Sequence, residues 1–465
     1  MGLRADKARC AAAELTKAAV EDDAFGNLAE SAIFRKYLLN ELDKSFASAV
    51  YKGTLSWITN IDALIASVSF RDIDVTDPFV SAVLRNAVWQ IMYSDRIPDH
   101  SAVDESVSVA RSISGIGPAS FVNAVLRKIT SKKTELKSRY ITDPVKYHLK
   151  CGLPPELAGY FKKWFGAERG LEIAASLHQN AEITIRVNRM ISGIDEIMLE
   201  LTEAGIEFEE SEFIRDALII QTGGRDISSL KGFRTGSFTV QDEAAMLASV
   251  IADPSEGDIV VDLCAAPGGK ACHMGELMNN KGKIYAFDIN PSRIRLIDEN
   301  TQRLGINVIK CFNADARVAD PFEGNGSKAD LVLADVPCSG LGILRRKPDI
   351  MLRMDHEKIT GLYPLQRQIL DHAAELVRVG GYLVYSTCTV NPEENENLIR
   401  SFIADQSGSF ETVDFSGILS IKLKKNSTVV SDIDSMDNAR KGMITLYPDR
   451  HGCDGFFISK MRRMR

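Results

Sequence analysis

Two cysteines follow segments that the sequence predicts to be buried strands. Cys338 lies in the run DVPCSG at 335–340, and Cys388 lies in the run YSTCTVNPEEN at 385–395. A thiolate is a strong nucleophile, whereas a cysteine among apolar residues is usually an inert small hydrophobe. The apolar description suits Cys264, Cys272 and Cys311. We therefore expect Cys338 and Cys388, which stand in polar turns, to be the reactive thiols.

One reaction that needs such a thiol is the transfer of a methyl group to carbon 5 of cytosine. That carbon is too weak a nucleophile until a thiolate adds to carbon 6. A base later removes the carbon-5 proton, and the thiolate leaves by elimination. The contexts of Cys338 and Cys388 do not by themselves show which thiol would attack.

Acidic residues close or follow the strands around these cysteines. The four are Asp262, Asp288, Asp315 and Asp335. A single aspartate of this kind is usually a helix cap or the start of a turn, but four at successive strand ends favour a ligand site. Clustered carboxylates would repel a diphosphate and would attract the sulfonium and ammonium groups of S-adenosylmethionine.

A glycine-rich turn, DLCAAPGGK at 262–270, ends the first of these strands and enters a helix. Its small residues let a ligand approach the backbone, and the N–H groups at the helix start are free donors. A nucleotide-dependent dehydrogenase is a poor alternative, because no G-x-G-x-x-G run follows a strand and the acidic cluster disfavours phosphate. The sequence therefore predicts S-adenosylmethionine as the cofactor.

Strand and helix patterns alternate from about residue 240 onward. Apolar runs predict strands at 259–263, 283–288, 308–312, 330–335 and 381–386, and amphipathic patterns predict helices at 292–304 and 363–377. This alternation is typical of a parallel sheet covered on both faces. We expect a doubly wound, Rossmann-like α/β domain over 239–465, with its ligand at the carboxyl ends of the strands. The segment 406–438 is rich in Ser and Asp, and this composition predicts a long surface connection.

Two further domains are expected before it. Apolar residues recur at helical spacing through 1–135, and Asp77-Pro78 is a typical helix start. Alternating residues at 184–188 and 217–220, with a helical stretch at 194–204 between them, predict a small α+β module over 140–238. We expect an all-α domain, then a small α+β module, then the α/β domain.

The bulk composition limits the class of protein. The chain has 465 residues, 45% of them hydrophobic and 26% charged, as in a soluble multidomain protein. No run is long and apolar enough to predict a membrane span. The eight cysteines include no CxxC pair, so we expect neither a zinc site nor a disulfide framework. We expect a cytoplasmic monomer that holds no metal.

The formal net charge of −7 is unusual for an enzyme of nucleic acids, because phosphates are contacted mainly by Lys and Arg. Binding depends on local patches rather than on the total. Two candidate patches are the run RRK at 345–347 and the basic C-terminal segment 460–465. We take Arg345, Arg346 and Lys347 as the expected RNA-binding residues.

These motifs together resemble the RsmB (Fmu/Sun) family of ribosomal RNA cytosine-5 methyltransferases. The matching runs are DLCAAPGGK, NAD at 313–315, DVPCSG with RRKPD at 345–349, and STCTVNPEEN at 386–395. The runs YSDRIPDHSAVDESV at 93–107 and FVNAVLRK at 121–128 resemble the NusB-type helical domain of that family. The resemblance covers nearly the whole chain and implies RNA binding by the helical domain and the small module.

The resemblance implies roles that spacing leaves open. It makes Cys388 the nucleophile and Cys338 the thiol that assists product release, whereas analogy with DNA cytosine methyltransferases would select Cys338 as the nucleophile. Asp335 then belongs to both the catalytic and the cofactor site. The other residues expected to contact S-adenosylmethionine are Cys264, Ala265, Ala266, Pro267, Gly268, Gly269, Lys270, Asp288 and Asp315.

The same resemblance implies small-subunit (16S) ribosomal RNA as the substrate. One alternative is the same chemistry on transfer RNA or another RNA. Another is a non-catalytic RNA-binding assembly factor, which predicts that loss of both cysteines would leave function intact. The presence of Cys338, Cys388 and the four aspartates disfavours the second alternative.

Overall fold

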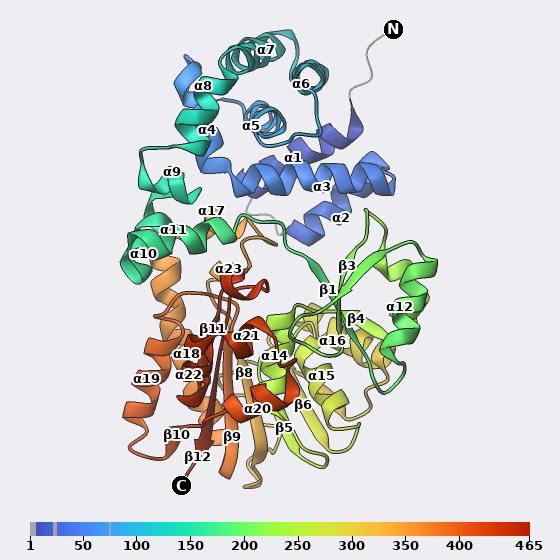
Figure 1. Ribbon diagram of the computed structural model, residues 1–465, viewed down its shortest axis with the longest axis vertical. Helices are drawn as coiled ribbons and strands as arrows, with labels where there is room; N and C mark the ends of the chain where they lie inside the picture. Colours follow the sequence, from blue (N-terminus) through green and yellow to red (C-terminus); the bar gives the residue numbers. More distant parts are fainter. Residues whose placement is uncertain (1–5, 22–25, 74–75) are drawn as a thin grey trace. The chain divides into compact units, whose positions relative to one another are not determined.

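The computed structural model describes residues 6–21, 26–73 and 76–465. Contacts between residues divide the chain into two compact units. The helical unit comprises Met1–Asn180 and Leu344–Asp355, and the sheet unit comprises Ala181–Ile343 and His356–Arg465. Both are drawn in Figure 1.

The helical unit is built from short and medium helices around two apolar cores. Asp77 begins α5 by accepting hydrogen bonds from the N–H groups of Phe79 and Val80, and Pro78 occupies the first turn. The apolar face that the sequence predicts on this helix is buried, with Val83 and Val88 in the core. The helices are α1 (Lys7–Glu21), α2 (Gly26–Tyr37), α3 (Glu41–Ser56), α4 (Ile58–Val68), α5 (Pro78–Met92), α6 (Asp99–Ser114), α7 (Ile116–Ser131), α8 (Lys133–Lys137), the π-helical turn η1 (Ser138–Thr142), α9 (Tyr147–Cys151), α10 (Pro155–Phe165), α11 (Ala167–Ser176) and α17 (Ile350–Arg353).

This unit extends well past residue 135. The buried amide of Asn60 on α4 donates to the carbonyls of Tyr140, at 2.7 Å, and Leu149, at 2.9 Å. The ring of Trp57 stacks on His178, with centroids 4.4 Å apart. These contacts join α9–α11 to the preceding helices, so the small sheet begins only after Asn180.

A small antiparallel sheet opens the sheet unit and forms the α+β module. Its strand order is β2-β3-β1-β4, and every pairing in it is antiparallel. The expected strand–helix–strand pattern is present. The elements are β1 (Ile183–Val187), α12 (Ile194–Glu203), β2 (Glu207–Glu210), β3 (Ala217–Gln221), the 3-10 turn η2 (Ile227–Ser229), α13 (Lys231–Arg234) and β4 (Phe238–Val240).

A mixed eight-stranded sheet forms the α/β domain. Its order is β10-β12-β9-β8-β5-β6-β7, with β11 paired to β12. The five strands from β9 to β7 are parallel, and β12 joins them in the antiparallel direction. The strands are β5 (Ile259–Asp262), β6 (Lys283–Asp288), β7 (Ile309–Asn313), β8 (Ala329–Asp335), β9 (Val377–Thr387), β10 (Phe410–Thr412), β11 (Met443–Leu446) and β12 (Phe456–Arg463). The expected doubly wound α/β fold is therefore confirmed.

Helices cover both faces of this sheet, because successive strand side chains point to opposite faces. Val260 packs in the core under α14, α15 and α20, and its neighbour Val261 packs in the core under α18 and α19. The helices are α14 (Glu243–Ala252), α15 (Gly269–Leu277), α16 (Pro291–Leu304), η3 (Leu341–Ile343), α18 (His356–Leu376), α19 (Glu396–Asp405), α20 (Ser416–Lys422), α21 (Thr428–Ser431), α22 (Ile433–Arg440) and α23 (Pro448–His451).

The expectation of an irregular surface connection at 406–438 is wrong. This segment contains β10, α20 and α21, and most of α22. Phe415 and Leu419 are fully buried in the core. The Ser and Asp residues that suggested a loop cap these short helices: Ser427 accepts from the N–H of Val430, and Asp432 accepts from the N–H of Ser435.

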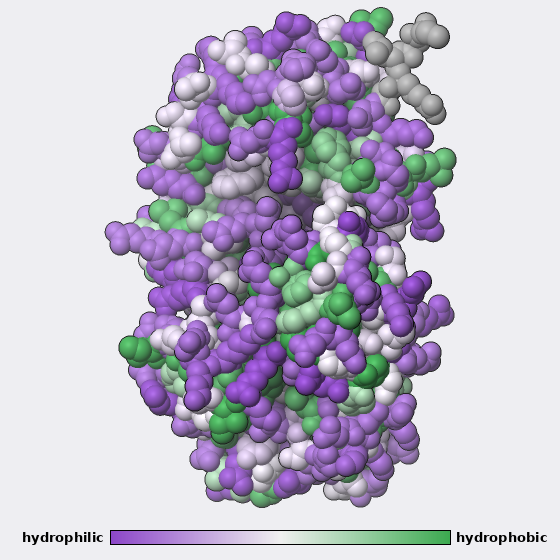
Figure 2. Space-filling view, turned by 45° about the vertical axis from the view of Figure 1, so that its right-hand side comes forward, coloured by the Kyte–Doolittle hydropathy of each residue, from purple (hydrophilic) through white to green (hydrophobic). Residues whose placement is uncertain are grey.

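The surface drawn in Figure 2 is mostly hydrophilic, with hydrophobic side chains in small scattered patches. None of the helices in the described ranges combines the length and the apolar character that a membrane crossing requires.

Candidate functional site

The topology gathers the predicted site residues at one edge of the large sheet. The strands β9, β8, β5 and β6 are neighbours and run in parallel, so their carboxyl ends meet at the same edge. Asp262, Asp288 and Asp335 are the last residues of β5, β6 and β8. Cys338 and Cys388 follow β8 and β9 directly. A ligand site is expected at this edge of a doubly wound sheet.

Backbone hydrogen bonds hold the glycine-rich turn after β5 in place. The N–H of Ala265 donates to the carbonyl of Phe287 at 2.8 Å, and the N–H of Gly268 donates to the carbonyl of Ala265 at 2.7 Å. Gly268 has φ +100°, and a Cβ there would lie 3.2 Å from Cα of Ile297 on α16. Glycine is therefore required at this position, both by the backbone conformation and by the close approach of α16.

Asp262 is a buried acid without a good partner. Its residue is 1% exposed, and neither carboxyl oxygen accepts a well-formed hydrogen bond from the described part of the chain. Burial, followed by the charge of Asp335, raises the pKa of Asp262 to about 7. An unsatisfied buried carboxyl is costly, so its presence suits a ligand that brings a donor or a cation.

The acids of the next two strands differ in their surroundings. Asp288 is 6% exposed, and its Oδ1 accepts from the N–H of Asn290 at 2.8 Å. Asp315 lies beyond β7 and lines an open cavity together with Gln368 of α18. Hydrogen bonds from Arg317 lower the pKa of Asp315. Asp288 is thus a buried acceptor, whereas Asp315 is a paired surface acid.

Asp335 lies at the centre of a hydrogen-bonded group. Its Oδ2 is 2.7 Å from Nζ of Lys270, and its Oδ1 accepts from Oγ of Ser386 at 2.7 Å. Burial opposes the charge on Lys270, but the carboxylate of Asp335 outweighs it, so the pKa of Lys270 is raised. Lys270, Asp335 and Ser386 therefore link the glycine-rich turn, β8 and β9.

The two thiols face each other. Sγ of Cys338 lies 3.4 Å from Sγ of Cys388. The N–H of Gly342 donates to the carbonyl of Cys388 at 3.0 Å and ties the two loops together. The hydrogen bond with Cys388, burial and the charge of Glu394 raise the pKa of the Cys338 thiol well above its ordinary value. The structure thus brings together the two cysteines that the sequence selected.

Sequence reasoning missed the acid behind these loops. Glu394 is 1% exposed, and its carboxylate accepts from the N–H and the hydroxyl of Ser339, from Gln366 and from Asn391. Its neighbour Glu393 is exposed and accepts only from Asn397 among the hydrogen bonds of the described chain. Nothing in the run NPEEN distinguishes the two glutamates, so no sequence signal could have found Glu394.

The first expected basic patch lies in the segment that returns to the helical unit. Arg345, Arg346 and Lys347 belong to the segment Leu344–Asp355, which is part of the helical unit. In that unit Leu352 packs against the core that includes Tyr51 and Leu55. Arg345 and Arg346 are half-buried, and Lys347 is exposed.

The C-terminal patch is not a continuous basic surface. Lys460 is 4% exposed, and its Nζ donates to the carbonyls of Ile251, at 2.8 Å, and Ala252, at 3.1 Å. These are the last residues of α14, where a cation interacts favourably with the helix dipole. Burial lowers the pKa of Lys460 to about 8. Lys460 is therefore not available to contact phosphates as part of the candidate patch at 460–465.

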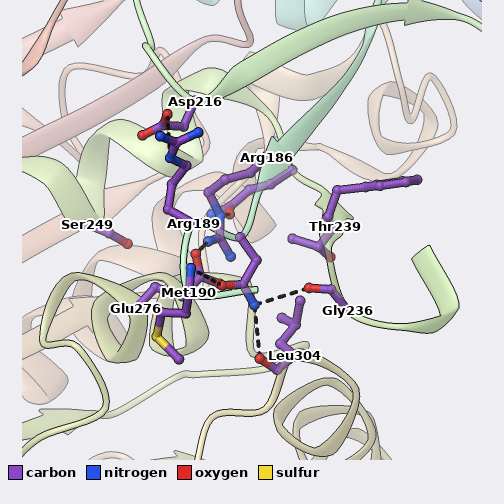
Figure 3. Close-up of polar contacts among 12 residues, drawn as sticks. Arg186, Arg189, Met190, Asp216, Gly236, Thr239, Ser249, Glu276 and Leu304 are labelled. Carbon is purple, nitrogen blue, oxygen red and sulfur yellow. Dashed lines mark hydrogen bonds and ion pairs between the residues drawn. The ribbon is translucent and has the colours of Figure 1, made fainter. Parts of the chain in front are cut away.

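A buried ion pair fastens the small module to the site. Arg186 of β1 pairs with Glu276 of α15, and its Nε donates to Oε1 of Gln241 at 2.7 Å. The amide of Asn188 donates to the carbonyls of Gly236, at 3.1 Å, and Leu304, at 2.9 Å. Figure 3 shows these contacts. They join the module to α15 and α16, the two helices that pack around the glycine-rich turn.

These residues fit S-adenosylmethionine. The unpaired carboxyl of Asp262 suits the ammonium group of the cofactor, and the buried Asp288 is placed to accept from ribose hydroxyls. The turn before α15 offers N–H donors. Asp315 is already paired with Arg317, and Asp335 with Lys270. Within residues 6–21, 26–73 and 76–465, no three His, Cys, Asp or Glu side chains gather so that they could hold a metal ion.

Comparisons with protein families match three parts of the chain. The model described as 16S rRNA methyltransferase RsmB/F matches residues 249–462. The NusB family matches residues 6–131, and the ferredoxin-like domain of RsmF/B-like methyltransferases matches residues 157–227.

Known proteins resemble the chain over most of its length. The probable ribosomal RNA small subunit methyltransferase B of Bacillus subtilis is 33% identical, over 95% of this chain and 96% of its own. Ribosomal RNA small subunit methyltransferase B of Pseudomonas syringae is 33% identical, over 79% and 81%. The crystal structure of PH0851 is 28% identical, with a TM-score of 0.78 and complete coverage of both chains. A methyltransferase homolog from Pyrococcus horikoshii is 29% identical over 68% of this chain and 97% of its own, with a TM-score of 0.55.

Proposed function

Because this chain belongs to the RsmB/F family of methyltransferases, we propose that it transfers a methyl group to carbon 5 of a cytosine in RNA, with S-adenosylmethionine as the donor. The family resemblance that its motifs predict is confirmed by relatives that align with nearly the whole chain. The position of the methyl group and the covalent route are our inferences from the site and the family resemblance, and the identity of the RNA is our inference from the relatives.

The observation that carries this proposal is the pair of thiols. Cys338 and Cys388 approach to 3.4 Å at the sheet edge where Asp262, Asp288 and Asp335 end their strands. A reaction that proceeds by simple attack of a nucleophilic amine on the methyl group needs no thiol. A reaction at carbon 5 of cytosine needs one thiolate that adds to carbon 6. It benefits from a second group when the product leaves.

In the proposed mechanism, the thiolate of Cys388 forms a bond to carbon 6 of the cytosine. The electron pair of the 5,6 double bond moves toward carbon 5, which becomes the nucleophile. S-adenosylmethionine, when bound, supplies the methyl group from its sulfonium. A base then removes the proton from carbon 5, the double bond re-forms, and the sulfur–carbon bond breaks. Cys338, adjacent to Cys388, assists this last step.

Other side chains prepare the site for these steps. Lys270 and Ser386 fix the carboxylate of Asp335, which supports its proposed role in contacting the target cytosine. Asp262, Asp288 and the segment 264–270 would hold the cofactor, with Asp315 at the outer side. We assign Asp335 to both the target cytosine and the cofactor, and we assign the remaining acids to the cofactor alone.

We propose small-subunit ribosomal RNA as the substrate, since the relatives cited above are named for that activity. Arg345, Arg346 and Lys347 remain the proposed phosphate contacts, and their place in the helical unit supports a role for that unit in binding RNA. The same chemistry on transfer RNA or another RNA is the alternative.

A methyl-transfer assay tests the proposal. The purified protein is incubated with tritiated S-adenosylmethionine and unmethylated small-subunit ribosomal RNA, and Cys388→Ala is compared with Cys311→Ala. Cys311 lies on β7, outside the thiol pair, so its variant is the matched control. We expect label on a single cytosine with the parent and Cys311→Ala, and none with Cys388→Ala.

Two other outcomes discriminate the alternatives. Binding of S-adenosylmethionine without transfer to this RNA would reject the ribosomal substrate and direct the assay to transfer RNA. Retention of biological function by a variant that lacks both Cys338 and Cys388 would favour a non-catalytic assembly factor and contradict the proposed chemistry.

A further inference from the structure

Glu394 is surrounded by hydrogen-bond donors. The backbone N–H of Ser339 donates to Oε2 at 2.9 Å, and Gln366 donates to the same oxygen at 2.7 Å. Asn391 donates to Oε1 at 2.8 Å, and the hydroxyl of Ser339 also bonds to Oε1. Four donors from the described residues face this carboxyl group, and carboxylate oxygens are suited to accept from all four.

The donors come from three different parts of the fold. Ser339 immediately follows Cys338, Asn391 lies in the loop after Cys388, and Gln366 lies on α18. Gln366 also donates to the carbonyl of Pro337 at 2.9 Å. One buried side chain therefore joins the loop that carries each cysteine to the helix behind them.

The hydroxyl groups between the loops complete this connection. Oγ of Ser339 lies 2.8 Å from Oγ1 of Thr389, which accepts from the N–H of Asn391 at 3.2 Å. The phenol of Tyr385 donates to the carbonyl of Glu394 at 2.8 Å. Because every one of these groups is buried, loss of the central acceptor would leave several donors unsatisfied.

We propose that Glu394 is a positioning residue that fixes the Cys338 loop against the Cys388 loop and keeps Cys338 as a neutral thiol beside the nucleophile. This inference deepens the proposed function and rests on it for the roles of the two cysteines. The geometry itself is independent of the RNA substrate, because it concerns the relation between two loops of the same unit.

The charge of Glu394 supports the second half of the proposal. A fixed negative charge near a thiol disfavours its thiolate, and the pKa of Cys338 is raised by Cys388 and by burial, with Glu394 adding to them. Cys388 must be a thiolate to attack carbon 6, whereas a neutral Cys338 can donate its proton to the sulfur of Cys388 as the sulfur–carbon bond breaks. The charge of Glu394 adds to the effects of Cys388 and of burial, which together keep Cys338 protonated.

Glu394→Gln and Glu393→Gln form a matched pair of variants. The substitution at 394 removes the charge and places an amide N–H₂ among donors, whereas the same substitution at the exposed Glu393 leaves the loops unchanged. Both variants are first checked for native circular dichroism and for the affinity of S-adenosylmethionine, which neither substitution should alter.

The first measurement follows alkylation of Cys338 by iodoacetamide as a function of pH, in a Cys388→Ser background, with the site located by mass spectrometry. We expect Glu394→Gln to lower the apparent pKa of Cys338 by about one unit, and Glu393→Gln to leave it in place. This readout involves no RNA, so it remains informative if the proposed substrate is wrong. An unchanged pKa in Glu394→Gln would overturn the electrostatic role.

The second measurement compares kcat and KM. We expect Glu394→Gln to lower kcat by about tenfold to a hundredfold, because the thiols lose their alignment, with little change in KM for S-adenosylmethionine. Ser339→Ala keeps the charge but removes one contact between the loops, so it should lower kcat and leave the pKa of Cys338 high. If Glu394→Gln does not fold, the kcat of Ser339→Ala alone tests the positioning role. Parent kcat in Ser339→Ala would then contradict the positioning role.

Discussion

Nζ of Lys270 lies 2.7 Å from Oδ2 of Asp335, so the basic residue of the glycine-rich turn is paired with the acid at the end of β8. The pair is partly buried, with side-chain exposures of 15% and 25%. Asp262 is close enough that the charge of Asp335 raises its pKa. Lys270 is therefore the cation near both acids, but its hydrogen bond goes to Asp335. The carboxyl group of Asp262 is left to interact with a ligand.

The first prediction concerns the pH dependence of cofactor binding. Because the pKa of Asp262 is about 7, the acid must lose a proton before it can pair with a cationic cofactor. The affinity for S-adenosylmethionine should rise by about tenfold per pH unit below that value and level off above it. Calorimetry in two buffers of different ionisation enthalpy would measure the released proton. Asp262→Asn should bind weakly at every pH.

Asp258→Asn is the control for this prediction, since Asp258 immediately precedes β5 and Asp262 ends it. The free protein should show the opposite trend in stability. Its folded state binds more protons at Asp262 than the unfolded state does between pH 3.8 and about 7, so stability falls as pH rises through this range. A cofactor affinity that is independent of pH in the parent protein would refute the role of Asp262.

The second prediction concerns the ion pair between Arg186 and Glu276. Arg186 is 2% exposed, and removing it leaves a buried carboxylate without its cation. We expect Arg186→Met to lower the free energy of unfolding by about 3 to 5 kcal/mol in denaturant titrations. The neighbouring pair of Arg189 and Asp216 is 3.5 Å apart and exposed, so Arg189→Met should cost less than about 1 kcal/mol. Equal effects of the two substitutions would contradict this account.

The third prediction concerns the approach of Gly342 to Gly455. A Cβ on Gly342 would lie 1.9 Å from the carbonyl oxygen of Gly455, so Gly342→Ala must displace backbone. We expect a loss of about 1 to 3 kcal/mol in unfolding free energy and a fall in activity, because Gly342 also donates to the carbonyl of Cys388. Gly417→Ala, where nothing lies within 4 Å, is the control. Parent stability in Gly342→Ala would show that the contact is not rigid.

Much of the large sheet could be predicted, because its parallel strands contain apolar runs and three of them, β5, β6 and β8, end in an aspartate. Asp262, Asp288 and Asp335 mark the sheet edge in the sequence, and the structure places all three there. The short helices and the strand of the segment 406–438 could not be predicted in the same way. Its apolar residues, such as Phe415 and Leu419, are interspersed with Ser, Asp and Lys, and its polar residues cap short helices.

The site was predictable as far as residue type and strand position determine it. The meeting of Cys338 and Cys388 follows from their places after adjacent parallel strands. The burial of Glu394 and Arg186 depends on tertiary packing, because a charged residue is usually exposed and the sequence gives no sign of the exception. For the same reason the sequence predicts that Lys460 lies on the surface in a basic segment, although its ammonium group caps α14.

The covalent intermediate is the central claim, and trapping it on Cys388 is the most direct test. The Cys338→Ala variant is incubated with RNA and S-adenosylmethionine, denatured, and analysed by gel electrophoresis and mass spectrometry, with Cys338→Ala/Cys388→Ala as the control. We predict a protein–RNA adduct at Cys388 that persists in Cys338→Ala and is absent from the double variant. Turnover by Cys338→Ala at the parent rate without an adduct, or an adduct at another residue, would contradict the account.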